Sequence, residues 1–433
     1  MAKKLSVFWF RRDLRWHDNH ALLKAFLYSE EVIPIFIFDP KILDSLSNND
    51  RRICLLFDRL QTLNTKIGAK KIQLQYGNPE LVFKNIFSKH DIQAVFCNED
   101  YEPYAINRDT KIKDLCHEKG IEFFSLKDQL IFHKDEILSD EGKPYSIYTP
   151  FMKKWVKKLI ETPLKTYHSE HHLNRISNKS LTSVKSLSAM GFSKISYQLL
   201  PPLISGSKFV EYENIRNQPL YDTTQLSVHL RFGFLSIREI VKVAHKYSES
   251  VLRELIWRSF FSQILWHHPH VVSQPFRKKY NDIEWNTDEK IALWKEGNTG
   301  FPIIDAGMRQ LNKTGYMHNR VRMLTASFLV KNMGIDWRLG ERYFADKLMD
   351  YDLASNNGNW QWAAGTGCDA APYFRIFNPI TQQNMYDPNL LYCKKYIENF
   401  DSYIKTTKPI LDLKKTRAES IERYKQCLKN EKN

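Results

Sequence analysis

The sequence lacks the features that mark several large classes of protein. Its six cysteines are scattered, with no C-x-x-C pair and no zinc-type spacing to histidine. We therefore expect reduced, isolated thiols and no metal site. No apolar run approaches the length that crosses a membrane, and the run at 5–10 is too short for a secretory signal. We expect a cytoplasmic protein that does not bind a membrane.

A G-x-G-x-x-G fingerprint is also absent after the first strand-like run, which argues against dinucleotide binding in the usual mode. What is present indicates a folded protein of 433 residues, because 42% of them are hydrophobic and 26% charged. The 64 Lys and Arg outnumber the 49 Asp and Glu, which gives a formal net charge of +15. A chain this basic usually meets a polyanion, and nucleic acid is the first candidate.

The chain changes character along its length. Strand-like runs are expected at 6–10, 32–38, 71–76, 94–97 and 122–125, with helical patterns between them at 19–28 and 53–65. This is the βαβ rhythm of a parallel, Rossmann-like sheet. After residue 201 strand-like runs vanish and amphipathic helical patterns take over. We predict an α/β domain at 1–130, an interdomain linker at 131–200 and an all-helical domain at 201–433.

The segment 350–379 is the most informative part of the chain, since it holds three carboxylates, several amides, two tryptophans and an arginine. Asp and Asn are rarely buried without partners, so plain core is an unlikely use for it. Carboxylates and amides can hold a heteroaromatic ring system, and closely spaced indoles can pass single electrons. Seven of the ten tryptophans lie between 257 and 362, which favours electron transfer, with a large aromatic core as the alternative.

Two helical patterns each gather unlike side chains on one face. Glu254, Trp257 and Arg258 stand at i, i+3 and i+4, a set that suits a polar aromatic ligand near a phosphate. An ordinary ion pair beside a core tryptophan is the alternative. Asn319, Arg322 and Met323 repeat the spacing, while Arg320 projects elsewhere and could meet a phosphate. Thr223, Thr224 and Ser227 come just before a helical stretch. Their hydroxyls suit a pyrophosphate at the helix N-terminus, and a simple helix cap is the alternative.

These segments together resemble the photolyase/cryptochrome family, specifically its class I cyclobutane pyrimidine dimer (CPD) photolyases. The resemblance rests on FWFRRDLRWHDN at 8–19, TGFPIIDAGMRQLNKTGYMHNRVRM at 299–323, DWRLGERYF at 336–344 and the segment 350–379. It implies an α/β antenna domain joined to an all-α domain that binds FAD. It also implies a monomer that repairs CPDs in UV-damaged DNA, by light-driven electron transfer from excited reduced FAD.

The resemblance also implies roles for individual residues. The implied FAD contacts are Tyr212, Thr223, Thr224, Gln225, Leu226, Ser227, Arg322, Asp350, Asp352 and Asn356. Arg322 is expected to pair with Asp350, and Asn356 to lie beside the reactive ring nitrogen. The implied catalytic residues are Glu254, Trp257, Asn319, Met323 and Asn356, and the implied electron path is Trp360, Trp337, Trp285. The implied DNA contacts are Arg216, Arg258, Arg320, Trp362, Arg375 and Gln382.

Three alternatives remain open. A (6-4) photolyase needs a proton donor, and the family pattern puts His where this chain has Asn319 and Met323. A cryptochrome-type blue-light photoreceptor of the plant type carries Asp where this chain has Asn356. A second, antenna chromophore is possible, and folate, a deazaflavin or a flavin are all candidates. Tyr104 and Ala105 stand where folate-binding relatives place an amide and an acid.

Overall fold

The computed structural model describes residues 4–287 and 289–430. By its packing the chain forms two compact units, each built from several stretches of sequence. The first unit contains residues 1–136, 155–201 and 226–245, and the second contains residues 137–154, 202–225 and 246–433. In the described part of the chain, no helix has both the length and the apolar character needed to cross a bilayer.

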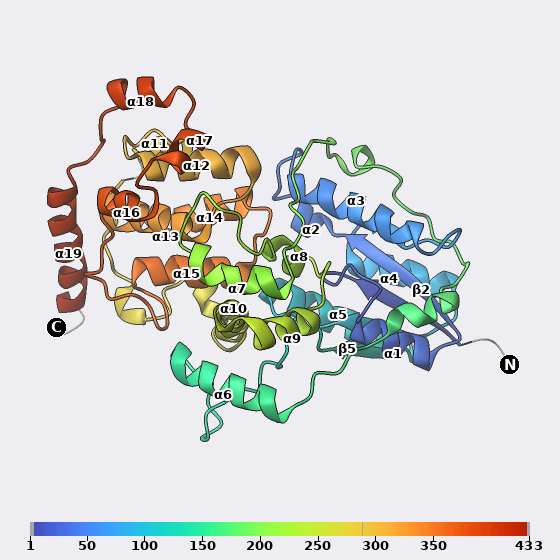
Figure 1. Cartoon of the computed structure of the whole chain (residues 1–433). Coiled ribbons are helices and arrows are strands. Elements are labelled where there is room, and N and C mark those ends of the chain that lie inside the picture. Colours follow the sequence, from blue (N-terminus) through green and yellow to red (C-terminus); the bar gives the residue numbers. More distant parts are fainter. Residues whose placement is uncertain (1–3, 288, 431–433) are drawn as a thin grey trace. The chain divides into compact units, whose positions relative to one another are not determined.

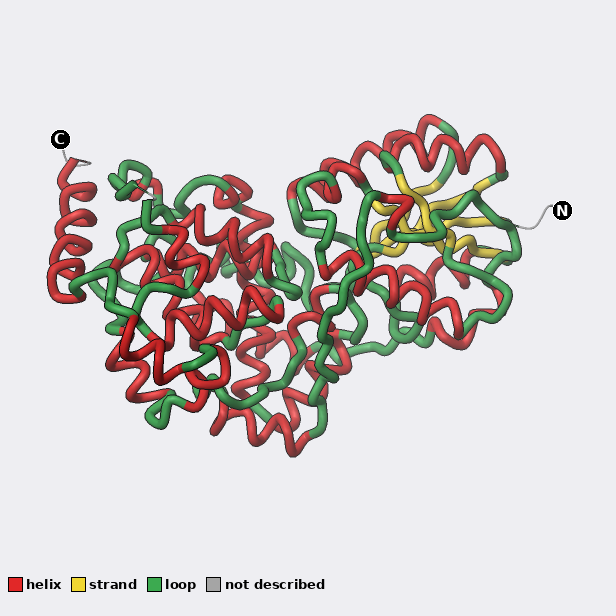
Figure 2. The backbone as a smooth tube through the Cα atoms, turned by 90° about the horizontal axis from the view of Figure 1, so that it is seen from above, coloured by secondary structure: helices red, strands yellow, loops and turns green. Residues whose placement is uncertain are grey.

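A five-stranded parallel sheet forms the centre of the first unit, in the order β3-β2-β1-β4-β5. Its strands are β1 (Leu5–Phe10), β2 (Glu31–Phe38), β3 (Gln73–Tyr76), β4 (Ile92–Asn98) and β5 (Glu122–Leu126). The main helices between them are α1 (His20–Tyr28), α3 (Arg51–Thr65), α4 (Pro79–Lys89) and α5 (Pro103–Glu118). Helices lie on both sides of the strands in Figure 2. Every residue of β1 is buried, as expected for a strand covered on both faces.

Residues 173–196, expected to be a linker, pack against this sheet. The short 3₁₀ turn η2 (Ser188–Met190) lies within this segment, and the end of η1 (Ser169–Arg175) overlaps its start. The Val184 amide donates to the Leu74 carbonyl at 2.7 Å, and the Ser177 amide donates to the Val32 carbonyl at 2.8 Å. Leu181 joins the hydrophobic core of the sheet. The segment therefore belongs to the first unit although it has little regular structure of its own.

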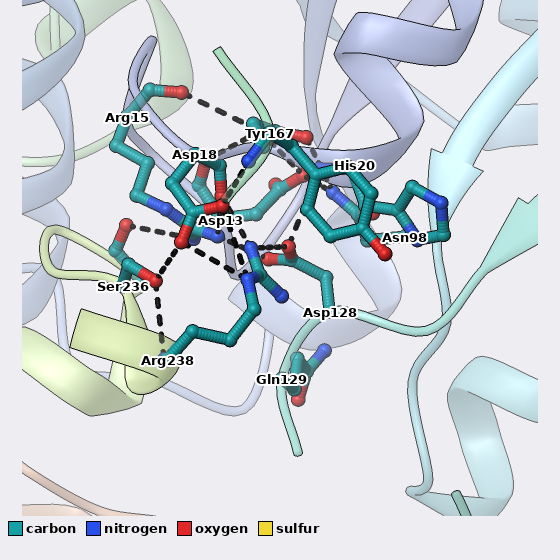
Figure 3. A network of polar contacts seen from close by, with 12 residues as sticks. Asp13, Arg15, Asp18, His20, Asn98, Asp128, Gln129, Tyr167, Ser236 and Arg238 are labelled. Carbon is teal, nitrogen blue, oxygen red and sulfur yellow. Dashed lines mark hydrogen bonds and ion pairs between the residues drawn. The ribbon is translucent and has the colours of Figure 1, made fainter. Parts of the chain in front are cut away.

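A buried polar network lies at the centre of the first unit (Figure 3). Arg15 Nη2 lies 2.6 Å from Asp128 Oδ2, and Arg238 of α9 (Ile237–Tyr247) lies 2.8 Å from Asp128 Oδ1 and 3.0 Å from Asp18 Oδ2. The Tyr167 amide donates to Asp18 Oδ1 at 2.7 Å. All four oxygens of the two carboxylates thus accept hydrogen bonds. Burial opposes ionisation of Asp128, but Arg15 and Arg238 outweigh it and lower its pKa.

The second unit is built from helices (Figure 1). Its longer helices are α7 (Gly206–Ile215), α10 (Glu249–His267), α12 (Pro302–Thr314), α13 (Asn319–Ser327), α14 (Trp337–Lys347), α15 (Leu353–Ala364), α16 (Pro379–Tyr386) and α19 (Leu413–Asn430). A continuous core of aromatic and aliphatic side chains joins α12 to α15. The charged C-terminal segment forms α19, whose Tyr424 is fully buried and donates to the Ala364 carbonyl.

Candidate cofactor and substrate site

The most polar part of the second unit is the start of α15. Asp352 caps this helix by accepting a hydrogen bond from the Ser355 amide at 3.0 Å, and Gly365 ends it with a φ of 78°. The cap and the glycine terminus explain why so polar a segment forms a regular helix. As a result, the side chains of this segment have fixed positions, and several of them line one pocket.

An ion pair forms one side of this pocket. Arg322 of α13 donates to Asp350 Oδ2 at 2.8 Å and to the Met317 carbonyl at 2.7 Å. Burial alone would lower the pKa of Arg322, but the Asp350 carboxylate outweighs it and raises the pKa. The second carboxylate oxygen, Asp350 Oδ1, is buried and has no hydrogen-bond partner among the described residues. A buried acceptor without a partner is costly, so this oxygen is suited to a donor from a bound molecule.

The pocket encloses about 580 Å³ of space, which includes open solvent. Its lining combines residues implied for cofactor binding with residues implied for the substrate. They are Asn319, Arg322, Met323, Ala326, Phe344, Leu348, Asp350, Tyr351, Asp352, Ser355, Asn356, Asn359, Trp360, Trp362 and Ala363. Apolar walls with a few fixed polar groups are typical of a site for a flat, partly polar ring system.

Asn356 is held in one orientation within the lining. Its side-chain amide nitrogen donates to Glu341 Oε1 at 2.8 Å and to the Glu341 carbonyl at 3.1 Å. Burial raises the pKa of Glu341, with the hydrogen bond from Asn356 acting against the rise. Because its nitrogen is engaged, Asn356 has its side-chain oxygen left to accept a hydrogen bond from a ligand.

The neighbouring amides have a structural role. Asn357 and Gln361 both donate to the Val271 carbonyl at 2.9 Å, and Gln361 accepts from the Phe276 amide at 2.8 Å. Both side chains are buried, and they fix residues 271–276 against α15. The amides of segment 350–379 therefore divide between the pocket and the scaffold, a division that the sequence does not reveal.

A second group of implied residues lies on α10. Glu254 pairs with Arg216 at 3.3 Å. Burial raises the pKa of the Glu254 carboxyl, and the Arg216 cation partly offsets the rise. Trp257 is half-buried, and Tyr148 stacks on it with ring centroids 3.6 Å apart and an angle of 3° between the planes. The Tyr148 hydroxyl donates to the Arg253 carbonyl at 3.0 Å. Sequence reasoning missed Tyr148, which is too far along the chain from α10 to leave a local pattern.

The structure places the other implied contacts as follows. Tyr212 lies on α7. Thr223, Thr224 and Gln225 belong to the second unit but do not line the pocket. Leu226 and Ser227 belong to the first unit. Arg258 is half-buried on α10, and Gln382 lies on α16. Arg320 donates to Asn217 and lies over the Tyr386 ring at 4.5 Å, and Arg375 lies 5.9 Å from the Trp362 ring. Sequence reasoning also missed Ser355 and Asn359, although both lie within the segment that it singled out.

The three implied electron carriers share one core cluster. Trp360 and Trp337 are buried, and Trp285 is half-buried at the edge of the cluster. A Cβ atom at Gly340 would stand 2.2 Å from Trp360 Cη2, so only glycine allows the indole to lie this close to α14. Trp294, for which no individual role was predicted, lies 6.2 Å from Trp360 between ring centroids.

Comparison with known proteins gives matches over most of the chain. A family profile described as "DNA photolyase" matches residues 6–168, and one described as "FAD binding domain of DNA photolyase" matches residues 251–426. The deoxyribodipyrimidine photo-lyase of a Synechococcus species is 36% identical, over 90% of this chain and 87% of the relative. The enzyme of the same name from Halobacterium salinarum is 33% identical, over 91% of this chain and 89% of the relative.

Solved structures agree with these matches. An archaeal photolyase from Sulfolobus tokodaii, solved with two FAD molecules, has a TM-score of 0.83 at 35% identity and covers 98% of this chain and 100% of its own. A class III photolyase from Agrobacterium tumefaciens has a TM-score of 0.88 at 28% identity, covering 99% and 98%. A Synechocystis cryptochrome, at 23% identity and a TM-score of 0.85, shares the fold.

These findings confirm the predicted α/β and helical parts and the prediction of FAD as cofactor. The pocket fits that cofactor, because it supplies the unpaired Asp350 oxygen, the Arg322 cation and the Asn356 oxygen beside apolar walls. Asp350, Arg322 and Asn356 are the polar groups of this pocket suited to a flavin.

Proposed function

Because the chain belongs to the photolyase/cryptochrome family, we propose that it repairs cyclobutane pyrimidine dimers in UV-damaged DNA, using light and acting as a monomer. One observation carries the proposal. The same pocket is lined by the Arg322–Asp350 pair and Asn356, implied for the flavin, and by Asn319, Met323 and Trp362, implied for the lesion. A cofactor and an extruded pyrimidine dimer can therefore meet there.

The cofactor does the difficult chemistry, and the protein binds and orients. FAD, bound in its reduced form and excited by light, would supply an electron that breaks the two bonds joining the pyrimidines, and the electron would then return to the flavin. The Arg322–Asp350 pair offers a cation and an acceptor to the ring system, and Asn356 offers a fixed oxygen. The apolar walls, which include Phe344 and Leu348, offer packing surface to the ring system.

We assign recognition of the damaged bases to α10 and α13. A dimer must leave the duplex to reach the pocket, and flipping costs least for a badly stacked lesion. Trp257 offers an indole face for stacking, and Tyr148 already covers one of its faces and braces the ring. Glu254, whose pKa is raised, can donate a hydrogen bond to a base carbonyl when protonated. Asn319 and Met323 line the pocket from α13.

We assign phosphate contacts to the basic side chains of the second unit. Arg216, Arg258, Arg320 and Arg375, together with Gln382, would hold the backbone around the lesion without reading its sequence. The net charge of +15 supports a polyanionic partner. Binding to damaged DNA should weaken steeply as salt increases, and a flat salt response would contradict this assignment.

We assign electron delivery to the pocket to Trp360, Trp337 and Trp285. The support is their shared core cluster, in which Trp360 and Trp337 are buried and Trp285 is half-buried. The Trp360→Phe variant tests this path, because photoreduction of bound oxidised flavin should be lost while repair after chemical reduction persists. Photoreduction that survives in the variant would show that electrons take another route.

The decisive experiment counts lesions in irradiated DNA after exposure to blue light with the purified protein, with a dark sample as control. Loss of cyclobutane dimers in the lit sample alone is the expected result. Loss of (6-4) lesions instead would favour the second type of repair, and loss of neither would favour a photoreceptor. The pocket lining argues against (6-4) repair, because Asn319 and Met323 belong to it and His318 does not.

A further inference from the structure

A cluster of histidine and glutamate side chains lies in the first unit, and none of its residues line the pocket of the second unit. It joins three segments that are distant in sequence: His17 after β1, His168 and Glu170 at the start of η1, and Glu239 on α9. The ligand atoms of His17, His168 and Glu170 all lie within 4.8 Å of one another. The sequence predicted no metal site, because only the fold brings these residues together.

The distances in the cluster match those of a metal coordination shell. His17 Nδ1 lies 3.0 Å from Glu170 Oε1, and His168 Nδ1 lies 3.2 Å from the same oxygen. Two ligand atoms bound to one zinc ion at 2.0–2.1 Å in tetrahedral geometry stand roughly 3.3 Å apart. Small shifts of these side chains would therefore be enough to place an ion between them.

Two further contacts support a ligand function. His17 Nε2 lies 2.7 Å from Glu239 Oε1, so Glu239 would accept from the outer nitrogen while Nδ1 binds the ion. A carboxylate behind a metal-bound histidine is the usual arrangement, because it fixes the ring and its tautomer. Glu170 Oε2 is buried without a hydrogen-bond partner among the described residues, whereas Oε1 faces all three imidazoles, including His171 at 3.5 Å.

We propose that His17, His168 and Glu170 form a binding site for a divalent transition metal ion of the zinc class. Two imidazoles and one carboxylate suit zinc, with His171 or water as the fourth ligand. Magnesium and calcium prefer oxygen ligands alone, so the two nitrogens disfavour them. The side chain of His168 is 57% exposed, which gives an ion access from solvent.

The bound ion would connect three segments of the first unit. The loop after β1 would be linked to η1, which begins the irregular segment packed along the sheet, and to α9 through Glu239. Such a link holds the irregular segment in place where regular secondary structure is sparse. Binding should therefore raise the midpoint of thermal unfolding of the full chain without altering its flavin content.

The test is a titration of the full, chelator-treated protein with zinc chloride, followed by equilibrium dialysis and metal analysis. We expect about one zinc ion per chain. His168→Ala and Glu170→Gln should lose the bound ion, and Glu239→Gln should weaken binding by about 10- to 100-fold. His117→Ala serves as the control, because His117 is an exposed histidine of the first unit outside the cluster.

Unchanged flavin content and circular dichroism show that each variant is folded. Glu170→Gln keeps the shape of the side chain, so its result stands even where an alanine variant is unstable. A wild-type protein that binds no zinc would overturn the proposal. Zinc affinity that is the same in Glu170→Gln as in the wild type, or lost equally in His117→Ala, would overturn it as well.

Discussion

Buried arginine–aspartate pairs occur in both units, and they differ in what they leave unpaired. In the first unit, all four oxygens of Asp18 and Asp128 accept hydrogen bonds (Figure 3). In the second unit, Asp350 uses one oxygen for Arg322 and leaves the other buried without a partner among the described residues. The first arrangement holds segments of the fold together, whereas the second is complete only when a ligand adds a donor.

The largest loss of stability is expected from a substitution in the polar network of the first unit. Arg238→Met leaves the carboxylates of Asp18 and Asp128 buried beside an apolar side chain and should lower the free energy of unfolding by about 3–5 kcal/mol. Arg253→Met is the matched control, since its i,i+4 pair with Glu249 is exposed and should contribute less than about 0.5 kcal/mol. Urea denaturation measures both. Equal losses in the two variants would contradict a structural role for the network.

The next largest effect is a loss of FAD binding, which we expect from a substitution in the second unit. Asp350→Ala removes the unpaired acceptor and should weaken FAD binding by about 10- to 100-fold, the worth of a hydrogen bond to a charged group. Titration of the flavin-free protein with FAD measures it. Asp401→Ala, an exposed aspartate of α18 (Phe400–Thr406), is the control and should bind as the wild type does. Wild-type affinity in Asp350→Ala would remove the basis of the comparison.

Smaller effects should distinguish the roles of two neighbouring side-chain amides, Asn356 and Asn357. Asn357→Ala removes one of the two amide donors to the Val271 carbonyl and should lower stability by about 1 kcal/mol, with FAD binding unchanged. Asn356→Ala should lower stability by a similar amount, because its two bonds to Glu341 are lost, and should in addition alter the absorption spectrum of the bound flavin, because Asn356 lines the pocket. Unfolding curves and flavin spectra check both. The reverse pattern would show that scaffold and pocket have been assigned the wrong way round.

The smallest effect is a pH dependence of repair per absorbed photon, which we expect from the ionisation of Glu254. Its pKa is raised, so the protonated, hydrogen-bond-donating form persists to higher pH than usual and is lost as pH rises through that pKa. Repair per absorbed photon should therefore fall by about 2- to 10-fold with rising pH in the wild type. Glu254→Gln keeps a donor at every pH and should show a flat profile. A pH dependence that persists in Glu254→Gln would assign it to another group.

Much of the fold could be predicted from the sequence, and less of the site. All five strands were found where predicted, because buried parallel strands leave continuous apolar runs such as β1. Residues 173–196 were expected to be a linker because their backbone contacts with the sheet leave no periodic pattern. The Arg322–Asp350 pair was expected by resemblance. The Tyr148–Trp257 stack and the His17 cluster could not be predicted from the sequence, because each joins segments that are distant in sequence.

The central claim is that the half-paired carboxylate at Asp350 marks a flavin site. The most direct test is to release the chromophore from the purified protein by denaturation, identify it by mass and count it. The account predicts about one FAD per chain from this pocket in the wild type and a marked deficit in Asp350→Ala. A colourless wild-type protein that takes up no FAD, or a full complement of FAD in Asp350→Ala, would contradict it.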